Sequence, residues 1–144
     1  MWQRIQTLYF ALCVGILLTL TFGTVGTIYT SDAPIEDVKY LSKLPYAILI
    51  ILSLIANLAA LFLWSNRSLQ IRLAGASATL LLALQIWLIV DYFTMGEGFV
   101  FKWTCILPAF AFVFDLLAIK GVYADELLVQ SASRLRSSKI KNKK

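Results

Sequence analysis

The stretch LAGASATLLLALQIWLIV, residues 73–90, decides the fold of this chain. It contains no charged residue, and its borders are clear because Arg67 and Arg72 precede it and Asp91 follows it. A helix of roughly 20 apolar residues is long enough to cross the hydrocarbon core of a bilayer. The stretch therefore predicts a transmembrane helix. The opposite signs of the charges at its two ends give that helix a direction in the membrane.

The composition extends this conclusion to the whole chain. Of its 144 residues, 60% are hydrophobic and only 15% are charged, whereas soluble domains are about 45–50% apolar and about 25% charged. A soluble domain of this length could not bury so much apolar surface. We therefore expect an integral membrane protein that forms one domain in the membrane.

Three further apolar runs accompany the first one. Together they predict an all-α membrane protein with four transmembrane helices, at about residues 8–28, 44–64, 73–91 and 103–120. Residues 1–121 are expected to form the four-helix bundle. Residues 122–144 are expected to form a cytoplasmic tail, in which the fourth helix continues as an amphipathic helix, with Gly121 as a candidate break, and ends in the basic sequence SSKIKNKK.

Two polar connections are expected on the outer side. The longer one, residues 29–43, contains Pro34 followed by acidic residues, which is typical of a turn or a helix start. A short helix on the membrane surface is plausible there. The second connection, residues 91–102, carries a turn signal at Gly96 and Gly98.

The first half of the central stretch is rich in small residues. Gly75, Ser77, Ala78 and Thr79 would let a neighbouring helix approach closely. We therefore expect this part of the third helix to pack tightly in the bundle.

Basic residues are distributed unevenly among the predicted connections. If both termini and the connection at residues 65–72 lie in the cytoplasm, that side holds ten of the 13 basic residues and the other side holds three. The positive-inside rule favours this orientation, so cytoplasmic N- and C-termini are expected. The ten are Arg4, Arg67, Arg72, Lys120, Arg134, Arg136, Lys139, Lys141, Lys143 and Lys144, and the three are Lys39, Lys43 and Lys102.

Asp115 is the first candidate for a functional residue because it lies within the fourth predicted helix. A charged residue at the bilayer centre costs about 2.5–3.5 kcal/mol on insertion scales and is a functional hypothesis by default. Three roles remain open at this point. Asp115 could pair with Asn57, Lys120 or Arg72 as part of the structure, it could relay a proton or an ion, or it could bind a basic residue of a partner subunit.

Several chemistries are excluded by what the sequence lacks. There is no histidine, which excludes Ser-His and Cys-His catalysis and His-ligated metal sites. Cys13 and Cys105 fall toward opposite faces in the predicted topology, so no disulfide is expected. No phosphate-binding loop or nucleophile motif is present, and the basic segments lack the aromatic residues that stack on bases. We expect no cofactor, no metal, no nucleic acid and no small-molecule substrate.

Three stretches carry a resemblance to a known family: WQRIQTLYF at residues 2–10, NRSLQIRL at residues 66–73 and DELLVQSASRLR at residues 125–136. With these stretches the chain resembles a family of small four-helix inner-membrane proteins from Bacteroidota, catalogued as domain of unknown function 4293. The resemblance covers essentially the whole chain. It implies a fold and a compartment, the bacterial inner membrane, but no activity.

All three stretches map to the cytoplasmic face of the predicted topology, where they would bring a set of polar residues together. The chain departs from the family pattern at Ala124, Gln130 and Ser133, where charged residues are common, and this weakens a docking role based on charge alone. The set could form an ion network that closes the inner end of the bundle, or a docking surface for a larger complex. Its members are Arg4, Gln6, Arg67, Gln70, Arg72, Asp125, Glu126, Arg134 and Arg136, with Asp115 deeper in the membrane.

These observations favour a non-enzymatic accessory or scaffold subunit of a larger bacterial inner-membrane complex, in envelope biogenesis or protein export. Its partners would be the lipid bilayer and other integral membrane subunits, contacted through helix packing and the cytoplasmic tail. The alternative is a small oligomeric transporter or channel that uses Asp115, Asn57 and Gln85.

Overall fold

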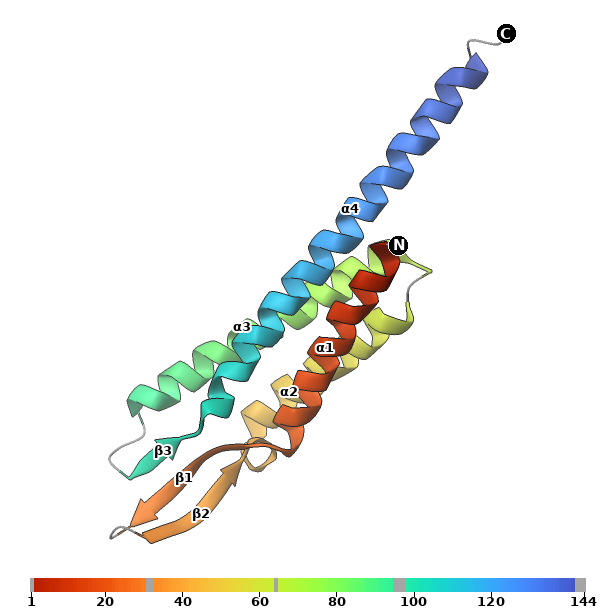
Figure 1. Ribbon diagram of the computed structural model, residues 1–144. Helices are drawn as coiled ribbons and strands as arrows, with labels where there is room; N and C mark the ends of the chain where they lie inside the picture. The colour runs from red at the N-terminus through yellow and green to blue at the C-terminus, as the bar shows by residue number, and fades with distance from the viewer. Residues whose placement is uncertain (1, 31–32, 64, 95–97, 142–144) are drawn as a thin grey trace.

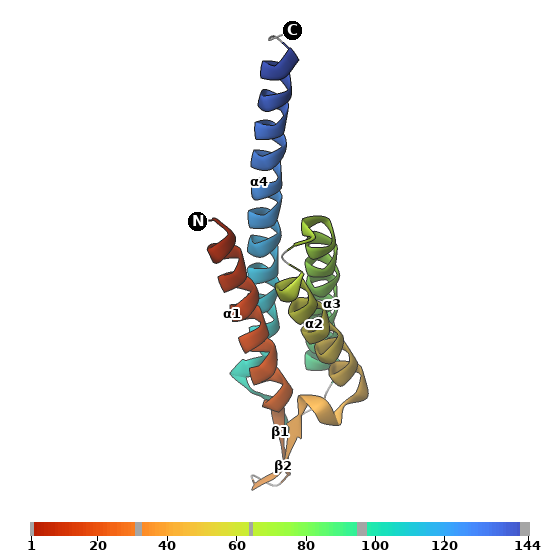
Figure 2. The same ribbon diagram turned by 90° about the vertical axis from the view of Figure 1, so that its right-hand side faces the viewer.

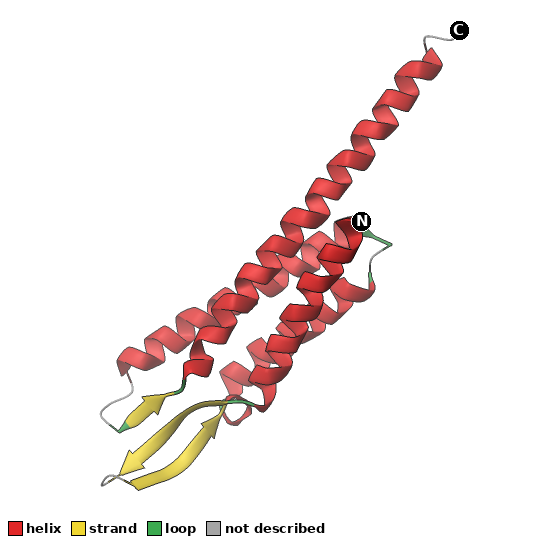
Figure 3. Ribbon diagram, in the orientation of Figure 1, coloured by secondary structure: helices red, strands yellow, loops and turns green. Residues whose placement is uncertain are grey.

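The chain folds into four long helices with a small antiparallel sheet at one end (Figure 1). The computed structural model describes residues 2–30, 33–63, 65–94 and 98–141. The helices are α1 (Trp2–Phe22), α2 (Leu44–Phe62), α3 (Arg67–Thr94) and α4 (Leu107–Lys141), with short 3-10 helices at Tyr40–Ser42 and Trp103–Ile106, and the strands are β1 (Thr24–Thr30), β2 (Ala33–Lys39) and β3 (Phe99–Phe101). The sheet lies opposite the chain's N-terminus, so we name the two ends of the bundle the sheet end and the N-terminal end (Figure 3).

Four helices are long and apolar enough to cross a membrane, as the sequence predicts. By length and composition the chain is therefore a multi-pass membrane protein. Helix α3 begins at Arg67 and ends at Thr94, so it includes the charged residues that border the central apolar stretch. Its 28 residues exceed the roughly 20 needed to cross the hydrocarbon core, so both charged ends can reach the membrane interfaces.

The prediction of an all-α fold is wrong at the end of the first apolar run. Helix α1 ends at Phe22 and not at residue 28, and β1 begins at Thr24. The sequence of β1, TVGTIYT, explains the change, because β-branched and aromatic residues favour an extended strand. Hydropathy alone joined this strand to the helix, since both are apolar.

The surface helix considered at Pro34 is also wrong, because Ala33–Lys39 forms the strand β2. Strand β2 pairs antiparallel with β1, and Thr30 faces Ala33 where the hairpin turns back. The residues between these two, at 31–32, lie outside the described part of the chain. The longest polar connection of the sequence is thus a β-hairpin that projects from the bundle (Figure 1).

A third strand completes the sheet in the order β2-β1-β3. Strand β3 pairs antiparallel with β1, with Gly26 facing Phe101 and Ile28 facing Phe99. Gly98 precedes β3 with a φ of 115°, a backbone conformation that glycine adopts without strain. The turn predicted around Gly96 and Gly98 therefore has a positive-φ glycine at its end, while Gly96 itself lies outside the described residues.

The core of the bundle consists of two hydrophobic clusters, one toward each end. Helix α1 packs on α4, α4 on α3, and α3 on α2. The cluster toward the sheet end contains Cys13, Leu17, Leu20, Val25, Tyr40, Tyr46, Ile50, Leu81, Leu84, Leu88 and Ala111, and the cluster toward the N-terminal end contains Phe10, Ala60, Ala74, Ala118 and Val122. Each of the four helices contributes to both clusters, and in the cluster toward the N-terminal end α2 and α3 contribute the small residues Ala60 and Ala74.

The expectation of close packing along the first half of the central stretch holds for one side of α3. Ser77 and Ala78 are buried in the bundle. A Cβ atom added at Gly75 would meet no atom within 4 Å, and Thr79 is exposed. The small residues that face the bundle therefore allow close packing, while Gly75 and Thr79 lie on the outer side of the helix.

Helix α4 is unbroken from Leu107 to Lys141 and extends far past the other helices (Figure 2). At about 1.5 Å per residue its 35 residues span about 52 Å. Gly121 is not a break in this helix. A Cβ atom at Gly121 would lie 3.0 Å from Cγ of Gln6, so the glycine lets α1 approach α4 closely.

Candidate functional site

A polar cluster lies between the two hydrophobic clusters, and we define it by Cys13, Ser53, Asn57, Ser77 and Asp115. Each of the four helices contributes at least one of these residues. All five side chains are fully buried, with 0% exposure. Cys13 itself belongs to the hydrophobic cluster toward the sheet end. Each of the other four residues lies, along its helix, between a residue of that cluster and a residue of the cluster toward the N-terminal end. The polar cluster therefore occupies the middle of the bundle.

Asn57 connects the polar cluster. Its Nδ2 atom donates hydrogen bonds to Ser77 Oγ, to the backbone oxygen of Ser53 at 3.2 Å and to Asp115 Oδ2 at 3.4 Å. The Cys13 thiol donates to the backbone oxygen of Ala111 at 3.6 Å. The Cys13 and Ser77 side chains also neighbour the Asp115 carboxyl group. Of the pairings considered for Asp115, the structure therefore shows the one with Asn57.

Three oxygen atoms of the polar cluster have no hydrogen-bond partner among the described residues. They are Ser53 Oγ, Asn57 Oδ1 and Asp115 Oδ1, and all three are buried. A buried polar atom without a partner generally costs about 1–3 kcal/mol, more if the group is charged. Neither Lys120 nor Arg72, the two basic candidates, forms a salt bridge with Asp115 in the described structure.

Gln85 does not belong to the polar cluster. It lies in α3 beyond Leu81, toward the sheet end, and lines a groove between α3 and the segment that leads into α4. Its Oε1 atom is buried and has no hydrogen-bond partner in the described part of the chain. Of the three residues considered for a transporter or channel, Asn57 and Asp115 therefore lie together, and Gln85 lies apart from them.

At the N-terminal end, a salt bridge ties α3 to α4. Arg67 Nη2 lies 3.0 Å from Asp125 Oδ2, and Arg67 Nη1 donates to the backbone oxygen of Asp125 at 3.5 Å. Both side chains are largely shielded from solvent. Two of the three family-like stretches therefore meet through this pair.

The other members of that network are less connected. Gln6 is buried against Gly121, and its Nε2 atom has no partner among the described residues. Gln70 is buried, and Gln130 Nε2 donates to Glu126 Oε1 at 3.4 Å. Arg72 and Arg134 are exposed, and the side chains of Arg4 and Arg136 lie outside the described part of the structure.

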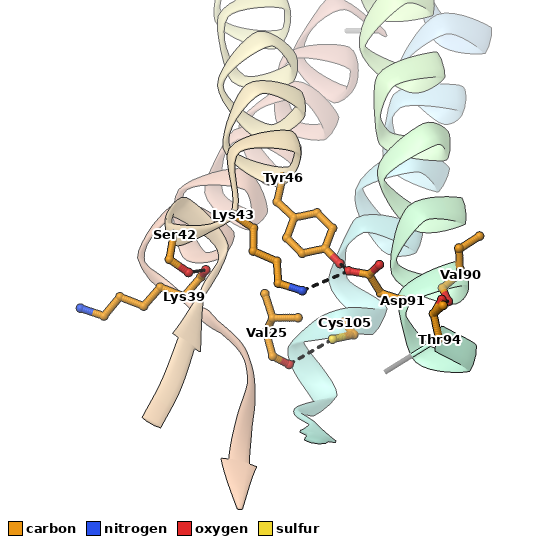
Figure 4. A network of polar contacts seen from close by, with 9 residues as sticks. All are labelled: Val25, Lys39, Ser42, Lys43, Tyr46, Val90, Asp91, Thr94 and Cys105. Atoms are coloured by element: carbon orange, nitrogen blue, oxygen red, sulfur yellow. Dashed lines mark hydrogen bonds and ion pairs between the residues drawn. The ribbon is translucent and has the colours of Figure 1, made fainter. Parts of the chain in front are cut away.

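The sheet end carries a network that the sequence did not predict (Figure 4). Asp91, at the end of α3, accepts hydrogen bonds from Tyr46 Oη and from Lys43 Nζ, the latter at 3.3 Å. The Cys105 thiol donates to the backbone oxygen of Val25 at 3.3 Å. The sequence did contain an indication of the ion pair between Lys43 and Asp91. Both residues border predicted helices on the same side of the membrane, and their charges are opposite.

A second pair links the hairpin to β3. Lys102 Nζ lies 3.0 Å from Asp37 Oδ1, which also accepts a 2.6 Å hydrogen bond from Thr27 Oγ1. The Thr27 hydrogen bond and the Lys102 ammonium group hold the pKa of the Asp37 carboxyl below its usual value. Three segments distant in sequence are thereby joined on the surface of the sheet.

The part of α4 beyond the bundle exposes several large apolar side chains. Tyr123, Leu127, Leu128, Val129 and Leu135 are each about half exposed or more. After Glu126 the sequence of the chain has no acidic residue and six basic ones. This segment therefore exposes apolar side chains, and its sequence is strongly basic.

Comparison with known proteins gives one match. A family model described as a domain of unknown function, DUF4293, matches residues 2–135. No curated protein and no solved structure matches the chain. The match confirms the family resemblance seen in the sequence.

Proposed function

We propose that this chain, which belongs to the DUF4293 family, is a non-enzymatic accessory subunit of a larger membrane complex that it joins through α4. The observation that carries the proposal is the long extension of α4 past every other helix (Figure 2). A helix that exposes large apolar side chains is stable in water when another element covers them. A single-chain function in the membrane gives no reason for such an extension.

The proposed docking surface is an apolar stripe formed by Leu128, Ala132 and Leu135. These residues recur at i, i+4 and i+7, so they lie on one side of α4. Gly121, seven residues before Leu128, lies on about the same side and contacts Gln6 of α1. The stripe thus extends the side of α4 that contacts α1 past the N-terminus of α1. A partner helix placed in line with α1 would fit against this stripe.

The charges specify the chemistry of that partner. Arg134 is exposed next to the stripe, and the residues after it add five more basic positions without an acidic one. Opposite charges at the rim of an interface steer association and select the partner. We therefore infer a partner helix with an apolar face and acidic flanks.

The location of the complex follows from the orientation in the membrane. The ten-to-three distribution of basic residues supports an N-terminal end in the cytoplasm and a sheet end outside. We propose the bacterial inner membrane as the compartment, with integral membrane subunits as partners, and envelope biogenesis or protein export as the process. The salt bridge between Arg67 and Asp125 would fix the direction in which α4 leaves the bundle.

The proposal is tested by purifying the tagged chain from its native membranes in a mild detergent and measuring the mass and subunit ratio of what is recovered. We expect a membrane subunit in fixed ratio, bound to the wild-type chain and lost from the variant Leu128→Glu/Leu135→Glu. The variant Gln130→Glu/Ser133→Glu adds the same charge on the other side of α4 and should keep the partner. Recovery of the wild type only as a monomer or a homo-oligomer contradicts the proposal.

The alternative of an oligomeric transporter or channel is favoured by one observation, the buried Asp115 with its unpartnered oxygen. The variant Asp115→Asn separates the two functions. An accessory subunit keeps its partner in this variant. If the partner is unchanged but ion flux through reconstituted liposomes disappears, the transporter is the correct function.

A further inference from the structure

The docking function makes no use of the polar cluster in the middle of the bundle. Asp115 lies there with a carboxyl group whose charge no described residue balances, since none of the salt bridges in the described structure includes it. The groups that face it are the Cys13 thiol from α1, the Asn57 amide from α2 and the Ser77 hydroxyl from α3, and none of them is a cation. A carboxylate enclosed in this way needs a positive charge from outside the chain.

The unpartnered atoms of the polar cluster are all oxygens. Asp115 Oδ1, Asn57 Oδ1 and Ser53 Oγ are buried without hydrogen-bond partners in the described structure. Their residues are in contact, because the Asn57 amide nitrogen donates to the Ser53 backbone oxygen and to the other oxygen of the Asp115 carboxyl group. A set of carboxylate, amide and hydroxyl oxygens is what hard cations prefer as ligands.

We propose that the polar cluster binds one exchangeable monovalent cation, Na⁺ or a proton, at Asp115. One carboxylate balances a single positive charge, so a divalent ion would leave an excess charge buried in the bundle. A soft metal ion would need thiolate or imidazole ligands, and Cys13 is the one sulfur in the polar cluster. A Na⁺ ion would take ligands from the unpartnered oxygens of the polar cluster, whereas a proton would neutralise the Asp115 carboxyl group itself. This site is independent of docking through α4.

The test follows the Asp115 part of the infrared carbonyl band of protonated carboxylic acids, taken as the difference between the full-length wild type and Asp115→Asn in detergent micelles, because every Asp and Glu of the chain contributes to the total band. One series replaces choline by Na⁺ at fixed pH, and the other varies pH in choline. If the cation is Na⁺, added Na⁺ removes the band and raises the unfolding temperature until the site is saturated. If the cation is a proton, the band grows on acidification, declines on alkalinisation and does not respond to Na⁺.

Variants assign these signals to the polar cluster. Asp115→Asn should also abolish the effect of Na⁺ on the unfolding temperature, while Ser53→Ala should weaken the Na⁺ response and leave the proton response of Asp115 intact. The control Asp91→Asn removes a carboxyl group at the sheet end and should leave both responses unchanged. An Asp115 band that is constant across pH and Na⁺ concentration, or no such band and no Na⁺ effect, overturns the proposal. If Asp115→Asn fails to fold, Asp115→Glu, which keeps a carboxyl group on a longer side chain, takes its place in the difference spectrum and should shift the band.

Discussion

Asn57 joins three helices through one amide group. It belongs to α2 and contacts Ser77 of α3 and Asp115 of α4. The sequence offered Asn57 as one of the residues that Asp115 could pair with. The structure adds that the same amide nitrogen also donates to Ser77 of α3, which no pattern in the sequence indicated.

Replacing Asn57 should destabilise the bundle measurably. In Asn57→Leu, the Ser77 hydroxyl and the Asp115 carboxyl group lose a donor while they remain buried, and we expect a loss of about 1–2 kcal/mol in the free energy of unfolding. Unfolding by SDS in mixed micelles measures this loss. Gln130→Ala, at an exposed position of α4, should change stability by less than about 0.5 kcal/mol.

A double variant checks the mechanism. Asn57→Leu/Asp115→Leu removes both the donor and the carboxyl group, so it should be more stable than Asn57→Leu alone, because no buried carboxyl group is left without a donor. A double variant as unstable as the sum of the two single ones would contradict this explanation.

Two glycines offer a matched comparison. A Cβ atom at Gly26 would lie 2.5 Å from the backbone oxygen of Val100 and 2.6 Å from the Phe99 ring, whereas one at Gly15 meets nothing within 4 Å. Gly26→Ala should therefore separate β1 from β3 and cost about 1–3 kcal/mol. Gly15→Ala should be neutral or stabilising by up to about 1 kcal/mol, since alanine favours a helix. The same SDS titration measures both, and equal effects would refute the close approach at Gly26.

Among the elements, the hairpin depends most on pH. Asp37 on β2 accepts bonds from Thr27 on β1 and from Lys102 next to β3. Its pKa is lower in the folded sheet than in an unfolded chain, so the carboxylate stabilises the sheet above the unfolded value of about 3.9, and this contribution disappears as pH falls through the lowered folded pKa. At neutral pH the contribution is present in full.

We therefore expect the amide protection factors of β1 to fall on acidification below about pH 4. Hydrogen exchange monitored by mass spectrometry, corrected for the intrinsic rate at each pH, measures the change. In Asp37→Asn the protection should be lower at neutral pH and should no longer depend on this titration. Protection in the wild type that is unchanged across this range would argue against a role for the Asp37 contacts.

The elements also show how far the sequence could predict this fold. Apolar runs of sufficient length identified four helices because a membrane span has few alternatives. The sheet was missed because residues 24–28 are uncharged and follow the apolar helix without a polar break, and their β-branched residues are what distinguishes them from it. The salt bridge between Arg67 and Asp125 was within reach, since both positions lie at one end of the predicted bundle. The unpartnered oxygens depend on side-chain geometry and could not be predicted.

At the scale of the whole molecule, the two ends differ in charge. The sheet end holds Lys39, Lys43 and Lys102, and the structure pairs the last two with Asp91 and Asp37. The N-terminal end and the extension of α4 hold the remaining basic residues of the sequence. This distribution supports the proposed orientation with the sheet outside.

Thiol labelling tests the orientation. A membrane-impermeant thiol reagent should label Glu36→Cys on β2 in intact cells, and should label Ser68→Cys at the start of α3 only after the membrane is permeabilised. Both positions are exposed, so access depends on the membrane alone. The parent chain gives the background from Cys13, which is buried, and Cys105, which is half-buried. The reverse pattern of labelling would show that the orientation is inverted.

The unbroken helix α4 couples the middle of the bundle mechanically to the far end of the tail. Asp115 and the end of α4 at Lys141 are parts of one rigid rod, 26 residues and about 39 Å apart along the helix axis. A tilt of about 5° around the middle of the bundle would move the far end of that rod by about 3 Å, given the same rise per residue. A change in the charge state of Asp115 that shifts α4 only slightly against its neighbours would thus be amplified at the tail, where a partner could sense it.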